Sequence, residues 1–148
     1  MTETARVVSV ERVIRATPEK IFDLLADPTQ HPRFDGSDTV KAARGDPARL
    51  SLGAQFSMDM RMGVPYRMKN TVVEFEDGRR IAWQHSAHNV WRYELEPVDG
   101  GTRVRESFDW TNGRGKKGIE LMGYPERNRK GMEATLERLA YLVEGGPA

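Results

Sequence analysis

The chain has 148 residues, a formal net charge of +1 from 23 basic and 22 acidic side chains, and no cysteine. A chain of this length can bury a sizeable core, so we expect residues 1–148 to form one domain. The balanced charge argues against DNA as a partner, since it gives no general attraction to nucleic acid. The absence of cysteine excludes disulfides, thiolate catalysis and cysteine-based metal sites.

The N-terminal residues 1–6 include an acidic side chain and are not followed by an apolar segment, so we expect no secretory signal there. No apolar run is long enough to span a bilayer. These features predict a cytoplasmic protein without stable membrane insertion, which we expect to be a monomer or a weak dimer.

The first part of the chain predicts one strand followed by two short helices. Residues 6–16 are rich in Val and Ile, but both alternating sets contain apolar residues, so either face of this strand could be buried. Thr17 and Pro18 are typical of a helix N-cap and a first helical residue, and residues 27–28 end that helix. A second helical turn follows at residues 29–31.

From residue 38 to residue 110, apolar and polar side chains alternate as they do in half-buried strands. The Asp77–Gly78 pair is a strong hairpin signal. Short strands joined by such turns predict an antiparallel meander. The predicted strands are residues 39–43, 55–62, 66–76, 80–86, 89–96 and 102–110.

Residues 124–144 predict one long amphipathic helix. Apolar side chains recur with the helical period, and Pro125 suits the first turn. The stripe consists of Met132, Leu136, Leu139 and Val143, and residues 145–147, Gly-Gly-Pro, end the helix. The apolar face of the sheet and this stripe must cover each other. Because the sheet face is the larger of the two, we expect part of it to line a cavity.

The order of strand, two short helices, meander and long helix resembles the START-like superfamily, also called SRPBCC, in its actinobacterial type. The similar segments are residues 10–28 (VERVIRATPEKIFDLLADP), 31–37 (HPRFDGS), 81–83 (IAW), 101–104 (GTRV) and 124–128 (YPERN). The resemblance implies an α+β helix-grip fold, a curved antiparallel sheet wrapped around a long C-terminal helix. The superfamily includes polyketide cyclases, dehydrases and lipid-transport proteins, so the resemblance implies a small hydrophobic ligand more firmly than any one reaction.

The inward positions of the predicted sheet, with one residue of the long helix, are the candidate ligand-binding residues. Methionine adapts to irregular ligands, and the polar edges of Tyr and Trp can orient a planar one. The alternative is that these side chains are packed core. The candidates are Met58, Met60, Met68, Trp83, His85, Trp91, Tyr93, Glu106, Phe108 and Tyr124.

Glu106 stands between two apolar inward positions, where a carboxylate is costly unless it is paired or neutral. We expect a buried ion pair between Arg12 and Glu106, which would lower the pKa of Glu106. The alternative is an acid/base pair of His85 and Glu106 in a cyclase or dehydratase type of enzyme. We expect His31 to be a local cap near a helix end.

Residues 113–118 match the pattern GxGxxG, but the chain offers no parallel βαβ unit for a dinucleotide, so we expect a flexible loop at the cavity rim. No metal-ligand spacing occurs, and we expect neither a metal nor a cofactor. The one basic cluster is Arg114, Lys116, Lys117, Arg127, Arg129 and Lys130. It is either a solvated face or an attraction for an anionic head group, a membrane surface or RNA, which leaves a regulatory role as a third functional hypothesis.

Overall fold

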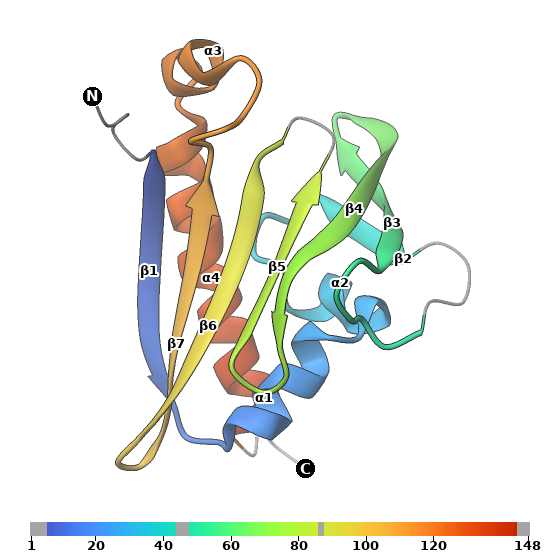
Figure 1. Cartoon of the computed structure of the whole chain (residues 1–148). Coiled ribbons are helices and arrows are strands. Elements are labelled where there is room, and N and C mark those ends of the chain that lie inside the picture. The colour runs from blue at the N-terminus through green and yellow to red at the C-terminus, as the bar shows by residue number, and fades with distance from the viewer. Residues whose placement is uncertain (1–5, 44–47, 86–87, 145–148) are drawn as a thin grey trace.

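The computed structural model describes residues 6–43, 48–85 and 88–144. The described chain is α+β, as predicted (Figure 1). Its elements are β1 (Val7–Ile14), α1 (Pro18–Leu25), a 3₁₀ helix (Pro28–Gln30), α2 (His31–Phe34), β2 (Val40–Ala43), β3 (Gln55–Met62), β4 (Val64–Glu76), β5 (Arg80–His85), β6 (Val90–Val98), β7 (Gly101–Asp109), α3 (Lys116–Leu121) and α4 (Tyr124–Val143).

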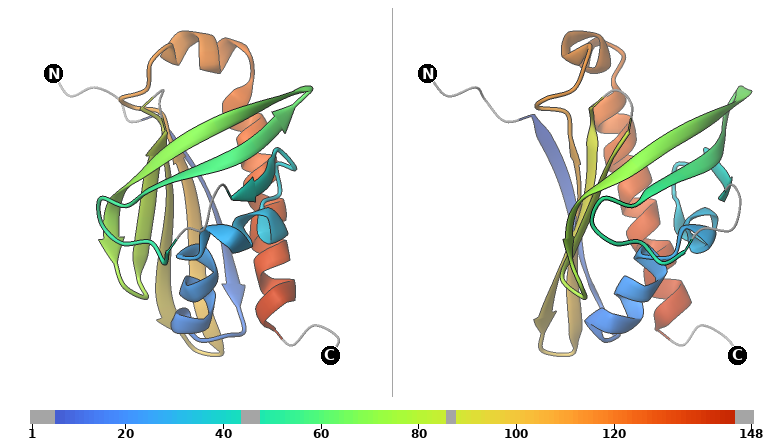
Figure 2. Two further views of the ribbon diagram at one scale, coloured as in Figure 1. Left: turned by 90° about the vertical axis from the view of Figure 1, so that its right-hand side faces the viewer. Right: turned by 45° about the vertical axis from the view of Figure 1, so that its right-hand side comes forward.

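The strands form one antiparallel sheet in the order β1-β7-β6-β5-β4-β3-β2. The first strand therefore lies beside the last one at one edge. The sheet is strongly curved, and Figure 2 shows the β3–β4 hairpin reaching across toward the end of α4 that lies near α3. The helix-grip prediction is confirmed.

The long helix α4 packs on the concave face, chiefly against β1 and β7. Its predicted stripe is the buried one, since Met132, Leu136, Leu139 and Val143 are all at most 4% exposed. Helix α1 closes the narrow end of the sheet with its own apolar face. Thr17 caps α1 as predicted, because its hydroxyl accepts a hydrogen bond from the Lys20 backbone amide.

Hydrogen bonds and an ion pair hold the chain after α2 against the middle of α4. The backbone amide of Gly36 donates a hydrogen bond of 2.8 Å to the Thr135 hydroxyl, and Arg138 pairs with Asp38 at 3.0 Å. Gly36 lies so close to the helix that a Cβ atom built on it would stand 2.3 Å from the Gly131 carbonyl oxygen. This approach also fixes Asp35, the neighbouring residue, at the cavity described below.

Some details of the fold differ from the sequence prediction, and two predicted features cannot be compared. Residues 113–118 were predicted to be a loop throughout, yet α3 begins at Lys116, directly after Gly115 in the left-handed conformation. Strand β4 begins two residues earlier than expected, and its pairing with β5 shifts between Val72 and Glu74. Residue 86 of the predicted strand and the Gly-Gly-Pro of residues 145–147 lie outside the described residues.

We expect Leu136→Ala to lower the free energy of unfolding by about 2–5 kcal/mol, because the side chain is fully buried between α4 and the sheet. Glu137→Ala, one residue along on the exposed face, should change it by no more than about 0.5 kcal/mol. Urea unfolding followed by circular dichroism measures both. Equal costs for the two variants would show that α4 does not cover the sheet.

We expect Gly36→Ala to destabilise the protein by about 1–3 kcal/mol, because the added methyl group must push the chain away from the α4 backbone. Gly118→Ala is the matched control. It adds the same methyl group inside α3, where nothing lies within 4 Å, so it should cost nothing. A Gly36 variant as stable as the Gly118 variant in the same urea titration would contradict the close approach.

Candidate functional site

A cavity of about 1010 Å³ lies between the concave face of the sheet and the N-terminal half of α4. It forms because α4 covers β1 and β7, whereas β3, β4 and β5 curve away from the helix. All ten predicted ligand-binding residues line it: Met58, Met60, Met68, Trp83, His85, Trp91, Tyr93, Glu106, Phe108 and Tyr124. That they bind a ligand remains a prediction.

Aromatic side chains form most of the inner wall. Trp91 and Phe108 are neighbours on β6 and β7, with ring centroids 4.7 Å apart. Trp83 stacks on His31 at 4.9 Å, and Phe56 meets Trp83 edge-on at 5.6 Å. These contacts join five different elements, so the wall is held by the tertiary fold rather than by any one hairpin.

His31 is a cavity residue that the sequence prediction missed. Its Nε2 atom donates a hydrogen bond of 2.8 Å to the Leu25 carbonyl oxygen, which agrees with the local cap that was predicted. Burial lowers its pKa to about 4, against the opposing effects of that hydrogen bond and of Asp27. A neutral, stacked imidazole is therefore part of the wall at neutral pH.

The register of the sheet separates the two residues that were proposed as an acid/base pair. Tyr93 pairs with Ile81 on one side and with Glu106 on the other, so these three residues form one row. His85 is four residues beyond Ile81 on β5, roughly 13 Å along the strand, and about 10 Å away across the strands. His85 and Glu106 share the cavity, but they are too far apart to transfer a proton directly.

Glu106 is buried, with 3% of its surface exposed, and its Oε1 atom has no hydrogen-bond partner. The expected ion pair with Arg12 is wrong. Arg12 stands opposite Val104 on the edge strand β1, and its side chain is exposed to solvent. Burial raises the pKa of Glu106 well above its ordinary value, outweighing a hydrogen bond from Tyr93 that lowers it, and Asp35 raises it further.

A second polar group lies near the far end of β5. Burial lowers the pKa of His85, and its Nδ1 atom has no hydrogen-bond partner. The buried Oδ1 atom of Asn89, on the same wall, is also without a partner. His85 is thus a neutral imidazole that can accept or donate one further hydrogen bond.

The predicted basic cluster is divided by the fold. Arg129 is paired with Glu126 and Glu133 on the surface of α4. Arg114, Arg127 and Lys130 border the cavity instead, and no salt bridge engages these three side chains within the described part of the chain. The Arg127 guanidinium lies over the Tyr124 ring at 5.7 Å. The cavity therefore has three cations at its rim, where the carboxylates of Asp35 and Glu126 also border it.

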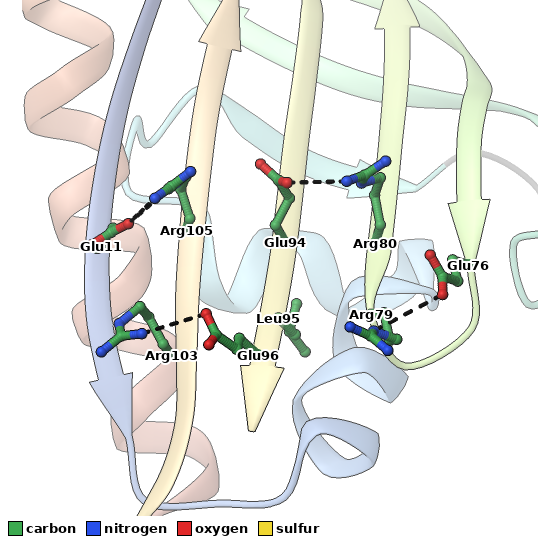
Figure 3. Close-up of a pocket in the computed structure, with 9 residues that line it drawn as sticks. All are labelled: Glu11, Glu76, Arg79, Arg80, Glu94, Leu95, Glu96, Arg103 and Arg105. Atoms are coloured by element: carbon green, nitrogen blue, oxygen red, sulfur yellow. Dashed lines mark hydrogen bonds and ion pairs between the residues drawn. The ribbon is translucent and has the colours of Figure 1, made fainter. Parts of the chain in front are cut away.

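A second, shallower depression of about 240 Å³ lies on the outer face of the sheet (Figure 3). Its walls are charged side chains that pair across neighbouring strands, such as Arg80 with Glu94 at 3.3 Å and Arg103 with Glu96 at 3.4 Å. Such exposed pairs contribute little individually and satisfy each other's charge. This face is a solvated surface of paired charges.

Within residues 6–43, 48–85 and 88–144, no three His, Asp or Glu side chains are grouped so that they could hold a metal ion. In the same ranges, no helix is long and apolar enough to cross a membrane. The GxGxxG segment follows an antiparallel strand, so it lacks the parallel βαβ unit that a dinucleotide site requires.

Comparison with known proteins agrees with this architecture. The chain is 35% identical over 141 residues to the uncharacterized protein Rv0088 of Mycobacterium tuberculosis; the match covers 91% of this chain and 63% of that protein. The chain thus spans less than two thirds of the length of this relative.

Solved structures share the fold at low sequence identity. The AHSA1-like protein of Aeromonas hydrophila has a TM-score of 0.70 and 19% identity, with 95% of this chain and 93% of that chain covered. A protein of Chromobacterium violaceum has a TM-score of 0.72 and 19% identity, with 97% and 99% covered. The family model described as polyketide cyclase / dehydrase and lipid transport matches residues 5–144, and the chain therefore belongs to that family.

Proposed function

We propose that this protein binds a small hydrophobic or aromatic molecule, such as a lipid or a polyketide-like compound, in the cavity between the sheet and α4. The supporting observation is the cavity itself, about 1010 Å³ of space walled by aromatic and methionine side chains. Protein cores leave few voids larger than a water molecule, and ligand sites are typically about 300–1,000 Å³. The residues that line this space are therefore best explained as a binding surface.

The composition of the wall supports a planar or flexible apolar ligand. Trp83 and Trp91 offer ring faces and edges, and Met58, Met60 and Met68 on the β3–β4 hairpin can adapt to different shapes. We propose that the protein acts in the cytoplasm as a monomer or weak dimer, with the small molecule as its partner.

The test fills part of the cavity with a larger side chain on β3. Met60→Trp places an indole in the space, so it should weaken the binding of an apolar fluorescent probe such as 1-pyrenebutanol at least tenfold. Gln55→Trp is the matched control, because Gln55 is exposed and lies outside the cavity. Quenching of Trp83 and Trp91 fluorescence reports probe binding in the parent, and native mass spectrometry would detect a co-purified ligand. Equal affinity in both variants would contradict the proposed site.

A cyclase or dehydratase type of enzyme is the second candidate, and Glu106 is the observation that favours it. A carboxyl group whose pKa is raised well above its ordinary value by burial in an apolar cavity is suited to act as a general acid. His85 cannot exchange a proton directly with Glu106, because it lies two strands away and two side-chain rows further along the sheet. In an enzyme, Glu106 would therefore act together with its neighbour Tyr93.

The raised pKa of Glu106 predicts how the stability of the protein depends on pH. A folded pKa above the unfolded value stabilises the protein fully below the unfolded pKa, and this stability is lost as pH rises through the folded pKa. We therefore expect the parent's unfolding free energy, relative to Glu106→Gln, to decrease from about pH 4.5 upward. Urea unfolding of both proteins at several pH values measures this difference. His31 and His85, whose pKa values are lowered, contribute the opposite pH dependence to each protein, so their contributions cancel in the comparison. A difference that increases with pH would mean that Glu106 is charged when folded.

A further inference from the structure

The inner wall of the cavity carries one acid whose hydrogen bonding is incomplete. Glu106 projects from β7 in the row formed with Tyr93 and Ile81, while Trp91 and Phe108 form the next row. It lines the cavity and is 97% buried, and its Oε1 atom lacks any partner. A buried polar atom of this kind is costly unless something in the cavity satisfies it.

The groups around Glu106 determine whether it can donate a hydrogen bond to a ligand. Arg12, the cation expected beside it, is exposed at the sheet edge. Titratable and charged groups face this cavity from every element packed around it: Tyr66 on β4, His85 on β5, Tyr93 on β6, His31 and Asp35 at α2, Arg114 before α3, and Tyr124, Glu126, Arg127 and Lys130 on α4. The cations of this set are Arg114, Arg127 and Lys130, which lie at the rim, whereas Asp35 disfavours a second negative charge at Glu106. Glu106 is therefore a carboxylic acid with an O–H group to donate.

The chemistry of this donor excludes some ligand groups and selects others. An ammonium group needs a carboxylate, and a hydrocarbon end would leave the acid unsatisfied. A carbonyl oxygen accepts one hydrogen bond without a charge and tolerates the flanking Trp91 and Phe108 rings.

We infer that Glu106 is a specificity-determining residue, which donates a hydrogen bond to a carbonyl oxygen at the inner end of the ligand. The ligands of this cavity are then apolar or aromatic molecules that carry a ketone, aldehyde or ester group. This inference rests on the proposed function, since it requires that a ligand occupies the cavity.

The experiment uses two probes that differ only in the carbonyl group. These are 6-propionyl-2-(dimethylamino)naphthalene, a ketone whose emission moves to longer wavelength when it accepts a hydrogen bond, and its 6-propyl analogue. The parent should bind the ketone about tenfold more tightly than the analogue, as one buried hydrogen bond implies. Glu106→Leu should reduce this preference below twofold and move the bound ketone's emission to shorter wavelength.

Two further variants separate hydrogen bonding from a general change of the fold. Glu106→Gln keeps an N–H donor of similar size and should retain most of the preference. Glu96→Leu removes a carboxylate from the outer face of β6, away from the cavity, and should leave the preference unchanged. A ketone preference that survives in Glu106→Leu, or that is lost equally in Glu96→Leu, would overturn the inference.

The pH profile gives an independent readout. In the parent, the ketone preference should decline as pH rises through the raised pKa of Glu106, whereas the amide of Glu106→Gln should show no such decline. His31 and His85 do not confuse this comparison, because their lowered pKa values keep them neutral in that range. An identical pH profile in the two proteins would contradict the inference.

The two proposals fail in different ways. If the parent binds both probes with equal affinity, and Met60→Trp weakens both, the cavity is a binding site but Glu106 does not select a carbonyl group. If neither probe binds, the proposed function fails and the inference fails with it.

Discussion

The structure depends on a mismatch between two apolar surfaces. Helix α4 presents one apolar stripe, and this stripe covers β1 and β7. The concave face continues over β6, β5, β4 and β3, beyond the reach of the helix. Helix α1 fills the narrow end with Ile21, Phe22 and Leu25. What remains uncovered is the cavity, so the proposed binding site follows from the curvature of the sheet and the width of one helix.

Ionisable groups are distributed unevenly around this cavity. The outer face of the sheet carries paired charges, and the rim carries cations on α4 and on the segment before α3. The inner wall carries Glu106, His31 and His85, and burial shifts the pKa of each of these groups toward its uncharged form. Asp35 is the carboxylate that acts on Glu106 and Tyr93 of this wall, whereas the cations border the cavity farther out, at the rim. The interior can distinguish ligands by hydrogen bonds, which depend on direction, rather than by net charge.

Much of the site could be predicted from the sequence, because strand alternation determines which side chains share a face. That rule placed Met58 and Met60 on one wall and Trp83 with His85 on the next. It failed for Arg12, whose alternation matches the buried Val10 and Ile14, because alternation does not distinguish an edge strand from a central one. A long side chain at an open edge can leave the core face for solvent.

The other differences have physical causes of the same kind. The residues around His31 in the sequence predicted only a local cap. Its stacking on Trp83 depends on the packing of α2 against strands that are distant in the sequence. The shift of pairing in β4 occurs between Val72 and Glu74, and a bulge changes the face of every later residue in a strand. Long-range packing and local irregularity are both invisible to a periodic pattern.

The placement of β1 has a consequence for how the chain reaches its folded state. The hydroxyl groups of Ser9 and Ser107 lie 2.8 Å apart across β1 and β7, although 98 positions separate them in the chain. Closing so long a loop is entropically unfavourable and raises contact order, which slows folding. During synthesis, β1 leaves the ribosome long before β7 exists, and its hydrogen-bonding edge stays open in the interval. Strand β1 is thus made before the other strands of the sheet, yet it can pair with β7 only after β7 is made, and until then its edge is open to other extended chains.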